Sequence, residues 1–364
     1  NKNMDILKIF IDHGVDLNLQ NKSLQTALHF ATEAEDEPLV KLLCASGADP
    51  DIIDKDHQTP IHIATARSYH KIVDILSDKF KASIMNRTKD GSTLMHLASN
   101  AYNSQAAMAF IRKGIPIHMP NKAGAKCIHM AAIRGHVEVV KAIVAKGESV
   151  DCRTKDGLTP LHLAVKFGQH EVVETLLGLG ANLQLKTGKL GETPLHIATM
   201  VKDGERCVDL LIKSGADVDA TEIKQETPMH FAARFNNLKA IQLLLEDGAK
   251  VDSQNIDGEN VLHVCVRESN LIIIETILDH IIKNRTGDEA RLLVNQQNKD
   301  GESSCHYTAK LNGKLSHIPD EDREIMRLLL KHGGDVFLET FQQRETPVHY
   351  CCQSGNTNVL SEIQ

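Results

Sequence analysis

A six-residue phrase with histidine at its fourth position recurs ten times along the chain and constrains the fold more than any other feature. Its first copies read TALHFA at 26–31 and TPIHIA at 59–64. Most neighbouring copies are 33 or 34 residues apart, and the last two intervals are 43 residues. Self-similarity at a fixed period of roughly 20–50 residues predicts a stack of like structural units. The histidines of the phrase are His29, His62, His96, His129, His162, His196, His230, His263, His306 and His349.

Each part of the period has a structural reason. Thr159 can accept a backbone N–H at the start of a helix, and Pro160 suits the first helical position, where a donor has no partner. Gly168 follows as a predicted helix end, because glycine favours the left-handed conformation found there. Apolar residues within 137–146 recur with the helical period and predict a second helix. Asp-Gly within 155–157 then predicts a tight hairpin turn.

A unit of helix, turn, helix and hairpin cannot bury its own apolar face, so it must stack on its neighbours. The 33-residue period with TPLHxA resembles the ankyrin repeat. The predicted fold is therefore all-α: an ankyrin-repeat solenoid with a helix-turn-helix and a β-hairpin loop in each repeat, stacked into a curved, right-handed array. We expect residues 1–364 to form a single array of about nine full repeats. Residues 4–14 and 356–364 resemble second helices of partial repeats, as in a fragment of a longer array.

Two repeats are longer than the others, with inserts at about 279–294 and 311–322. The first follows a long second helix, which we expect from Asn270 to about Asn284, and Pro319 marks the expected start of the helix after the second insert. Insertions in repeat proteins map to loops on one face, which is often a binding face. The alternative is tolerated surface variation, because lengthening a loop costs little free energy.

Some repeats depart from the pattern in ways that weaken them. Residues 126–129 and 260–263 lack the Thr-Pro that starts the first helix, and Phe80 stands where most repeats have a helix-ending glycine. Stability in repeat arrays is approximately a sum of local and nearest-neighbour contributions. Local unfolding is therefore expected to begin at these repeats or at the two ends.

Composition excludes several classes of function. A net charge of −7, without any long run of Lys and Arg, argues against nucleic acid as a partner. No apolar stretch reaches the roughly 18 residues that a membrane helix needs, so no span is expected in this sequence. Eight cysteines are scattered without a CxxC pair, which is typical of a reducing compartment.

The residues that could carry chemistry have simpler explanations. The ten recurring histidines would stand about 10 Å apart in a stack of helices, too far to share a zinc ion. Cys351, beside Cys352 and His349, replaces the small alanine of the phrase, and the acidic run 320–322 lies where a helix start favours negative charge. No phosphate-binding loop or hydrolase motif occurs. We therefore predict no enzyme activity, no catalytic, cofactor-binding or metal residues, and no cofactor; no motif identifies partner-binding residues.

Two segments extend the resemblance. Residues 188–207 (GKLGETPLHIATMVKDGERC) and 298–360, which include NKDGESSCHYTAK and HIPDEDREIMRLLLKHGGDV, are similar to the ankyrin array of TRPN channels. These are mechanosensitive TRP cation channels, in which two lengthened repeats also occur consecutively. The resemblance implies a cytoplasmic N-terminal array at the plasma membrane, on a homotetrameric channel. It further implies that the array acts as a gating spring between the pore and microtubules.

Two other classes of ankyrin protein remain as alternatives. One is a soluble adaptor or membrane-skeleton protein whose concave face binds protein ligands, and the other is a regulatory module joined to an enzyme or ligase domain. The character of the exposed surface distinguishes a protein-binding role of the array from a mechanical one. A conventional partner site predicts a contiguous exposed patch that is apolar or of one charge, whereas an evenly mixed surface favours a mechanical role.

Overall fold

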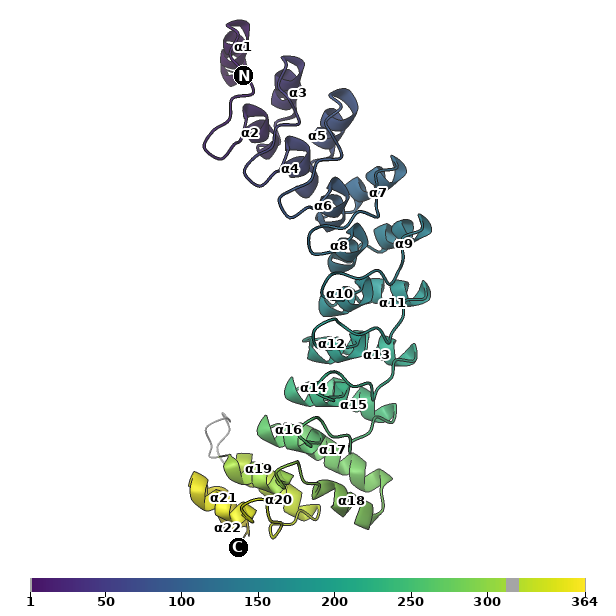
Figure 1. The fold of residues 1–364 in the computed structure, drawn as a ribbon, viewed down its shortest axis with the longest axis vertical. Helices are drawn as coiled ribbons and strands as arrows, with labels where there is room; N and C mark the ends of the chain where they lie inside the picture. Colours follow the sequence, from purple (N-terminus) through teal and green to yellow (C-terminus); the bar gives the residue numbers. More distant parts are fainter. Residues whose placement is uncertain (1, 312–320, 364) are drawn as a thin grey trace. The chain divides into compact units, whose positions relative to one another are not determined.

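The computed structural model describes residues 2–311 and 321–363, which form short helices joined by tight loops (Figure 1). The chain divides into two compact units, Asn1–Asn182 and Leu183–Gln364, here called unit 1 and unit 2. In each unit a first helix, which begins within the recurring phrase, alternates with a second helix packed against it. The solenoid of paired helices predicted from the period is confirmed.

Unit 1 has five first helices, which pack on one another in a row (Figure 1). They are α2 (Ala27–Glu33), α4 (Pro60–Ala66), α6 (Leu94–Asn100), α8 (Cys127–Arg134) and α10 (Pro160–Lys166). The second helices form the other row: α1 (Lys2–Asp12), α3 (Glu37–Ala45), α5 (His70–Asp74) continued by the π-helical turn η1 (Ile75–Lys79), α7 (Gln105–Arg112), α9 (Val137–Ala145) and α11 (His170–Gly178).

Unit 2 repeats the arrangement with longer elements toward its end (Figure 1). Its first helices are α12 (Pro194–Met200), α14 (Pro228–Arg234), α16 (Val261–Arg267), α19 (Ser304–Lys310) and α21 (Pro347–Ser354). Its second helices are α13 (Glu205–Lys213), α15 (Leu238–Glu246), α17 (Leu271–Asn284), α20 (Glu321–Lys331) and α22 (Thr357–Ile363). One further helix, α18 (Gly287–Val294), has no counterpart in the other repeats.

The first helices begin as the phrase predicts. Pro160 is the first residue of α10, and the hydroxyl of Thr159 accepts the backbone N–H of His162 at 3.4 Å. Asn260 takes the threonine's place before α16, and its side-chain carbonyl accepts the N–H of His263 at 3.2 Å. The missing Thr-Pro is therefore compensated at that helix start.

The loops between repeats are hairpins held by backbone hydrogen bonds. In one of them the Asp54 N–H donates to Gln58 O at 2.9 Å, and the His57 N–H donates to Asp54 O at 3.0 Å. Across residues 2–311 and 321–363, the turns are too tight for either arm to form a strand. The hairpins expected from the sequence are present as turns without a β ladder.

The core lies between the two rows of helices. Leu161 and Ala164 of the phrase are fully buried, as are Val139, Val140 and Ile143 on the second helix α9. Aromatic residues make up only 4% of the chain, and small aliphatic side chains allow such short helices to pack closely. The apolar stripe read from the sequence is thus the face that each second helix buries.

The repeat that contains Phe80 ends its second helix in an unusual way. The Phe80 N–H donates to Ile75 O at 3.3 Å, five residues back, so the helix widens into the π-helical turn η1. Lys81 then adopts φ 51°, a left-handed conformation that glycine adopts at Gly47 and Gly147. A non-glycine residue pays a steric cost in this conformation, and π-helical turns are rare in regular helices.

The first insert forms a helix. The long second helix expected from Asn270 to about Asn284 is confirmed as α17, and the rest of the insert, for which no helix was expected, builds α18. The Glu289 N–H donates to the Thr286 hydroxyl at 3.4 Å, and the Thr286 N–H donates to the Glu289 carboxylate at 3.0 Å, which makes a capping box. The second insert, with Pro319, lies mostly outside the described residues, and α20 begins at Glu321.

Candidate functional site

The described part of the chain, residues 2–311 and 321–363, gathers no three His, Cys, Asp or Glu side chains that could hold a metal ion. Cys265 and Cys351 take the alanine position of the phrase and are buried. Burial raises the pKa of the Cys351 thiol to about 11, so this sulfur stays protonated and behaves as a small apolar group. The polar groups that do converge lie where one repeat meets the next.

The recurring histidine joins each repeat to the following loop. At His62, Nδ1 accepts the Thr59 N–H at 3.2 Å, and Nε2 lies 3.1 Å from Asn86 O in the next repeat. The same bridge recurs in both units: His29 to Gln58, His96 to Ala125, His129 to Cys152, His196 to Glu226, His230 to Glu259, His263 to Glu302 and His306 to Glu345.

The geometry of this bridge requires a neutral imidazole. Because Nδ1 accepts a backbone N–H, the ring proton must lie on Nε2, which donates to the carbonyl. Burial disfavours the charged form and lowers the pKa of His129, His196 and His263 to about 4. Protonation would place a hydrogen on Nδ1 against the N–H that it now accepts, so each bridge depends on the neutral ring.

A second contact links the tips of successive loops through the backbone. In unit 1 the Lys122 N–H donates to Asp90 O at 2.9 Å, and the Lys155 N–H donates to Ala123 O at 2.9 Å. In unit 2 the Ile223 N–H donates to Leu190 O at 3.0 Å. The other bonds of this kind run from Lys55 to Ser23, Lys89 to Asp56, Ile256 to Lys224, Lys299 to Asp257 and Phe341 to Asp300. The loops therefore stack in register with the helices.

A third contact ties the start of a second helix to the preceding repeat. His136 Nε2 lies 2.9 Å from Ala101 O, and the Asn237 side-chain amide donates to Thr199 O at 3.1 Å. Gln169, Asn270 and Asn356 make the same connection to Ile133, Ala233 and Leu311. Tyr69 takes this position before α5, and within the described residues its hydroxyl makes no such bond. The repeat with Phe80 therefore lacks this third contact, while the Arg67 guanidinium donates to Glu33 O of the preceding repeat at 3.1 Å.

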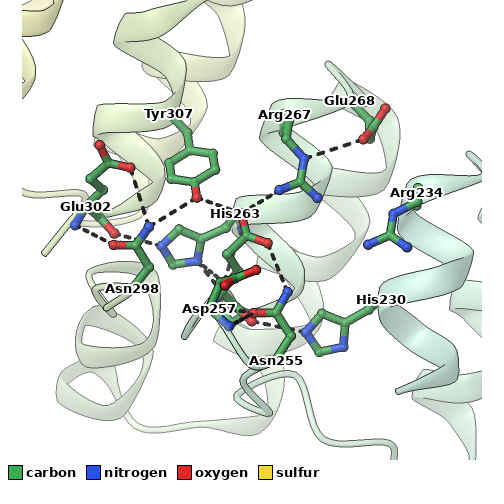
Figure 2. Close-up of polar contacts among 12 residues, drawn as sticks. His230, Arg234, Asn255, Asp257, His263, Arg267, Glu268, Asn298, Glu302 and Tyr307 are labelled. Atoms are coloured by element: carbon green, nitrogen blue, oxygen red, sulfur yellow. Dashed lines mark hydrogen bonds and ion pairs between the residues drawn. The ribbon is translucent and has the colours of Figure 1, made fainter. Parts of the chain in front are cut away.

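Unit 2 adds a ladder of buried carboxylates, each directly before the capping residue of a first helix. Figure 2 shows one of them, Glu302, beside Asn298. We call Glu226, Glu259 and Glu302 the glutamate ladder; they are 2%, 6% and 8% exposed. The Tyr307 hydroxyl, from the next repeat, donates to Glu259 at 2.6 Å, and Tyr350 donates to Glu302 at 2.8 Å. Each tyrosine therefore reaches across an interface between repeats.

The ladder's charges are compensated locally. Arg234, Arg267 and Lys310 form ion pairs with the three glutamates in turn. The Asn255 amide also donates to Glu259 at 2.9 Å (Figure 2). Burial alone would raise the pKa of the Glu259 carboxyl, but the hydrogen bonds to it outweigh that effect and hold the pKa below its ordinary value.

Removing one partner of such a network costs more than the pair contributes, because a buried charge is left uncompensated. In unit 1 the equivalent positions before the capping residue hold neutral side chains. They are Gln25, Gln58, Ser92, Ala125 and Leu158. The two units therefore share the histidine bridges and the loop-tip bonds but differ in this extra cross-link.

The exposed ends of the first helices carry side chains of mixed character. In unit 1, Phe167 is about half exposed directly after α10, and Arg67 stands at the equivalent end of α4. In unit 2, Phe235 and Glu268 occupy the same place on successive repeats. This one position therefore holds apolar, basic and acidic side chains in different repeats.

Sequence reasoning missed the glutamate ladder and the loop-tip bonds. A signal for the first was present, since Glu226, Glu259 and Glu302 directly precede the phrase in successive repeats. The partners of these glutamates could not be predicted, because the hydroxyl that donates to Glu259 belongs to Tyr307, 48 residues further along the chain.

Comparison with known proteins agrees with the geometry. Across residues 2–311 and 321–363, no helix is both long and apolar enough to cross a membrane. No curated protein matches the chain. A family model of three ankyrin repeats matches residues 1–88, 94–187, 128–222 and 195–288. Together with the histidine bridges and the stacked helix pairs, this match establishes that the chain belongs to the ankyrin-repeat family.

Proposed function

We propose that residues 1–364 form one continuous array that serves as an elastic tether in a mechanosensitive cation channel, coupling the pore to the cytoskeleton. The similarity of residues 188–207 and 298–360 to TRPN arrays supports this identity. Under this proposal the array lies on the cytoplasmic side of the plasma membrane, the parent protein is a homotetramer, and microtubules are the cytoskeletal partner. Ankyrin arrays generally act as protein-interaction modules rather than as enzymes.

The observation that carries the proposal is the repetition of the same links at successive interfaces. Histidine bridges and loop-tip bonds join each repeat only to its neighbours within a unit. Such a stack is mechanically one-dimensional. A small change of angle at every interface adds up to a large change of length at low force. Under this proposal no single residue carries the function, because every interface contributes.

Single-molecule pulling on the chain, held at its two ends, tests the proposal. We expect reversible extension at forces below unfolding, followed by stepwise rupture. A repeat of 33 residues should release about 10 nm, given roughly 3.3–3.6 Å per extended residue. A globular domain in the same tether provides the control for handle compliance. A stack that stays stiff until it ruptures would contradict the spring.

A second candidate is a protein-binding module of an adaptor or membrane-skeleton protein. It is favoured by the loop tips of unit 1, where exposed lysines recur at one position, unlike the mixed ends of the first helices. A tether and a binding module are not exclusive, because an array that transmits force must also be held by a partner.

A further inference from the structure

The loop tips of unit 1 carry the same basic residue in five successive repeats. We call Lys22, Lys55, Lys89, Lys122 and Lys155 the lysine row. All five are exposed, and each occupies the second position of its hairpin turn. In unit 2 that position varies: it holds Ile223, Ile256 and Phe341, and a lysine again at Lys299. An unbroken succession of five lysines is therefore a property of unit 1, whereas apolar residues interrupt the position in unit 2.

Backbone contacts fix the spacing of the row. The N–H of each lysine from Lys55 onward donates to the preceding tip at 2.9–3.1 Å, so the tips follow one another at the repeat distance. Contacts with the preceding loop also fix the aliphatic part of two of these side chains. Cγ of Lys122 lies 3.2 Å from where a Cβ on Gly91 would stand, and Lys155 covers Gly124 in the same way. The aliphatic parts of these two side chains therefore lie over the preceding tip, and all five lysines are exposed.

The ammonium groups are available to a ligand. Within residues 2–311 and 321–363, none of the five forms an ion pair with a carboxylate. Aspartates follow three of them, at Asp56, Asp90 and Asp156. The Asp90 carboxylate is turned toward its own loop, where it accepts hydrogen bonds from the hydroxyls of Thr88 and Ser92. The tips of Lys22 and Lys122 carry no acidic residue, so the row is basic on balance.

We propose that the lysine row binds an extended acidic segment of a partner protein that has a carboxylate at every third residue. Neighbouring repeats lie about 10 Å apart, as packed helices do. A polyproline II segment has three residues per turn and rises about 3.1 Å per residue, so every third side chain points the same way at about 9 Å intervals. A β-strand would turn alternate side chains away from the row. The proposal rests on the array acting as a protein-binding module and adds the chemistry of one partner.

A designed peptide tests the spacing. The probe is four Glu-Pro-Pro triplets with a fluorescent label, and its binding to the chain is measured by fluorescence anisotropy. One control peptide has the same composition with its glutamates regrouped into adjacent pairs, and another replaces each Glu by Gln. We expect the regular peptide to bind at least about tenfold tighter than the regrouped one, because several surface ion pairs form together. Affinity should fall as salt rises.

Variants of the protein locate the binding site. Lys89→Gln/Lys122→Gln removes two central charges of the row, and Lys41→Gln/Lys146→Gln removes two exposed charges from the second helices α3 and the end of α9. The first pair should weaken binding of the regular peptide by roughly three- to thirtyfold, as expected for two exposed ion pairs. The second pair should leave it within about twofold. Thermal melting by circular dichroism checks that both variants stay folded.

Three results would overturn the proposal: equal affinity for the regular and regrouped peptides, equal losses in the two lysine variants, or competition by a twelve-nucleotide oligothymidylate at the peptide's own affinity. The last would mean that the row attracts any polyanion. None of these results affects the force-extension curve, so failure of the lysine row and failure of the spring are separately detectable.

Discussion

At the scale of single residues, the recurring histidine is a structural link that has to stay uncharged. His230 is buried, its Nδ1 accepts the Thr227 N–H at 3.2 Å, and its Nε2 lies 3.2 Å from Glu259 O. His349 has the same place in the phrase and the same bond to Thr346, but its side chain is exposed. The chain therefore contains a buried and an exposed copy of one motif.

These two copies give a matched pair of variants. His230→Leu should lower the free energy of unfolding of unit 2 by about 2–4 kcal/mol, because it removes a bridge and leaves a buried N–H and a carbonyl without partners. His349→Leu should cost less than about 1 kcal/mol. Urea titration followed by circular dichroism measures both. Equal losses in the two variants would show that the bridge adds nothing beyond the local helix cap.

The tyrosines of the glutamate ladder make a second prediction. Tyr307→Phe removes a hydrogen bond to a buried charge and should destabilise unit 2 by about 1.5–3 kcal/mol. A double-mutant cycle with Glu259→Gln should give a coupling energy of about 1 kcal/mol or more. Tyr102, whose side chain is 94% exposed, gives the control: Tyr102→Phe should leave the free energy of unfolding unchanged. Additive effects of Tyr307→Phe and Glu259→Gln would mean that the two groups do not interact.

At the scale of elements, the sequence predicted the helices whose ends have a local signal. Thr159 and Pro160 specified the start of α10, and the apolar stripe in 137–146 specified α9. Two elements were not predicted. The π-helical turn η1 arises because Phe80 cannot end a helix as glycine does, and helix α18 depends on the Thr286 cap and on burial against α17. Phe80 and the Thr286–Glu289 capping box are local signals, but the sequence does not reveal that the backbone widens at Phe80 or that α18 packs against α17.

The repeat with Phe80 should be the least protected interior part of unit 1. Its second helix is split between α5 and η1, Lys81 is held in a left-handed conformation, and Tyr69 makes no bond to the preceding repeat. In hydrogen exchange read by mass spectrometry, amides of 70–79 should exchange faster than those of 137–145 in α9. Uniform protection across the two helices would refute this expectation.

At the scale of the whole molecule, stability and compliance are sums over similar interfaces. The 33-residue period predicted a row of similar interfaces, because ten copies of the phrase place ten histidines in equivalent positions. Which interfaces are stronger could not be predicted. That depends on Tyr307 and Tyr350 meeting glutamates 48 residues earlier in the chain. Long-range pairs of this kind have no signature in a local motif.

The free energy of unfolding should decrease as the pH is lowered, because the histidines of the bridges become protonated over the same pH range. The native pKa of His129, His196 and His263 is about 4, below the ordinary value of 6.5, so the unfolded chain binds protons first as pH falls. Their contribution is complete above about pH 6.5 and declines toward pH 4, at up to about 1.4 kcal/mol per pH unit for each histidine. Urea titrations at pH 7.5, 6.0 and 5.0 measure the trend. Equal unfolding midpoints at these values would contradict neutral, buried bridges.

The force at which each repeat ruptures tests most directly whether the links between repeats set the mechanics of the chain. If links between repeats set the mechanics, the chain should rupture in two force classes, with the repeats of the glutamate ladder in the stronger one. Tyr307→Phe/Tyr350→Phe should lower only that class and leave the other unchanged, because these hydroxyls cross interfaces in unit 2 alone. A single force class that does not respond to the loss of both hydroxyls would contradict the claim that these interfaces carry the function.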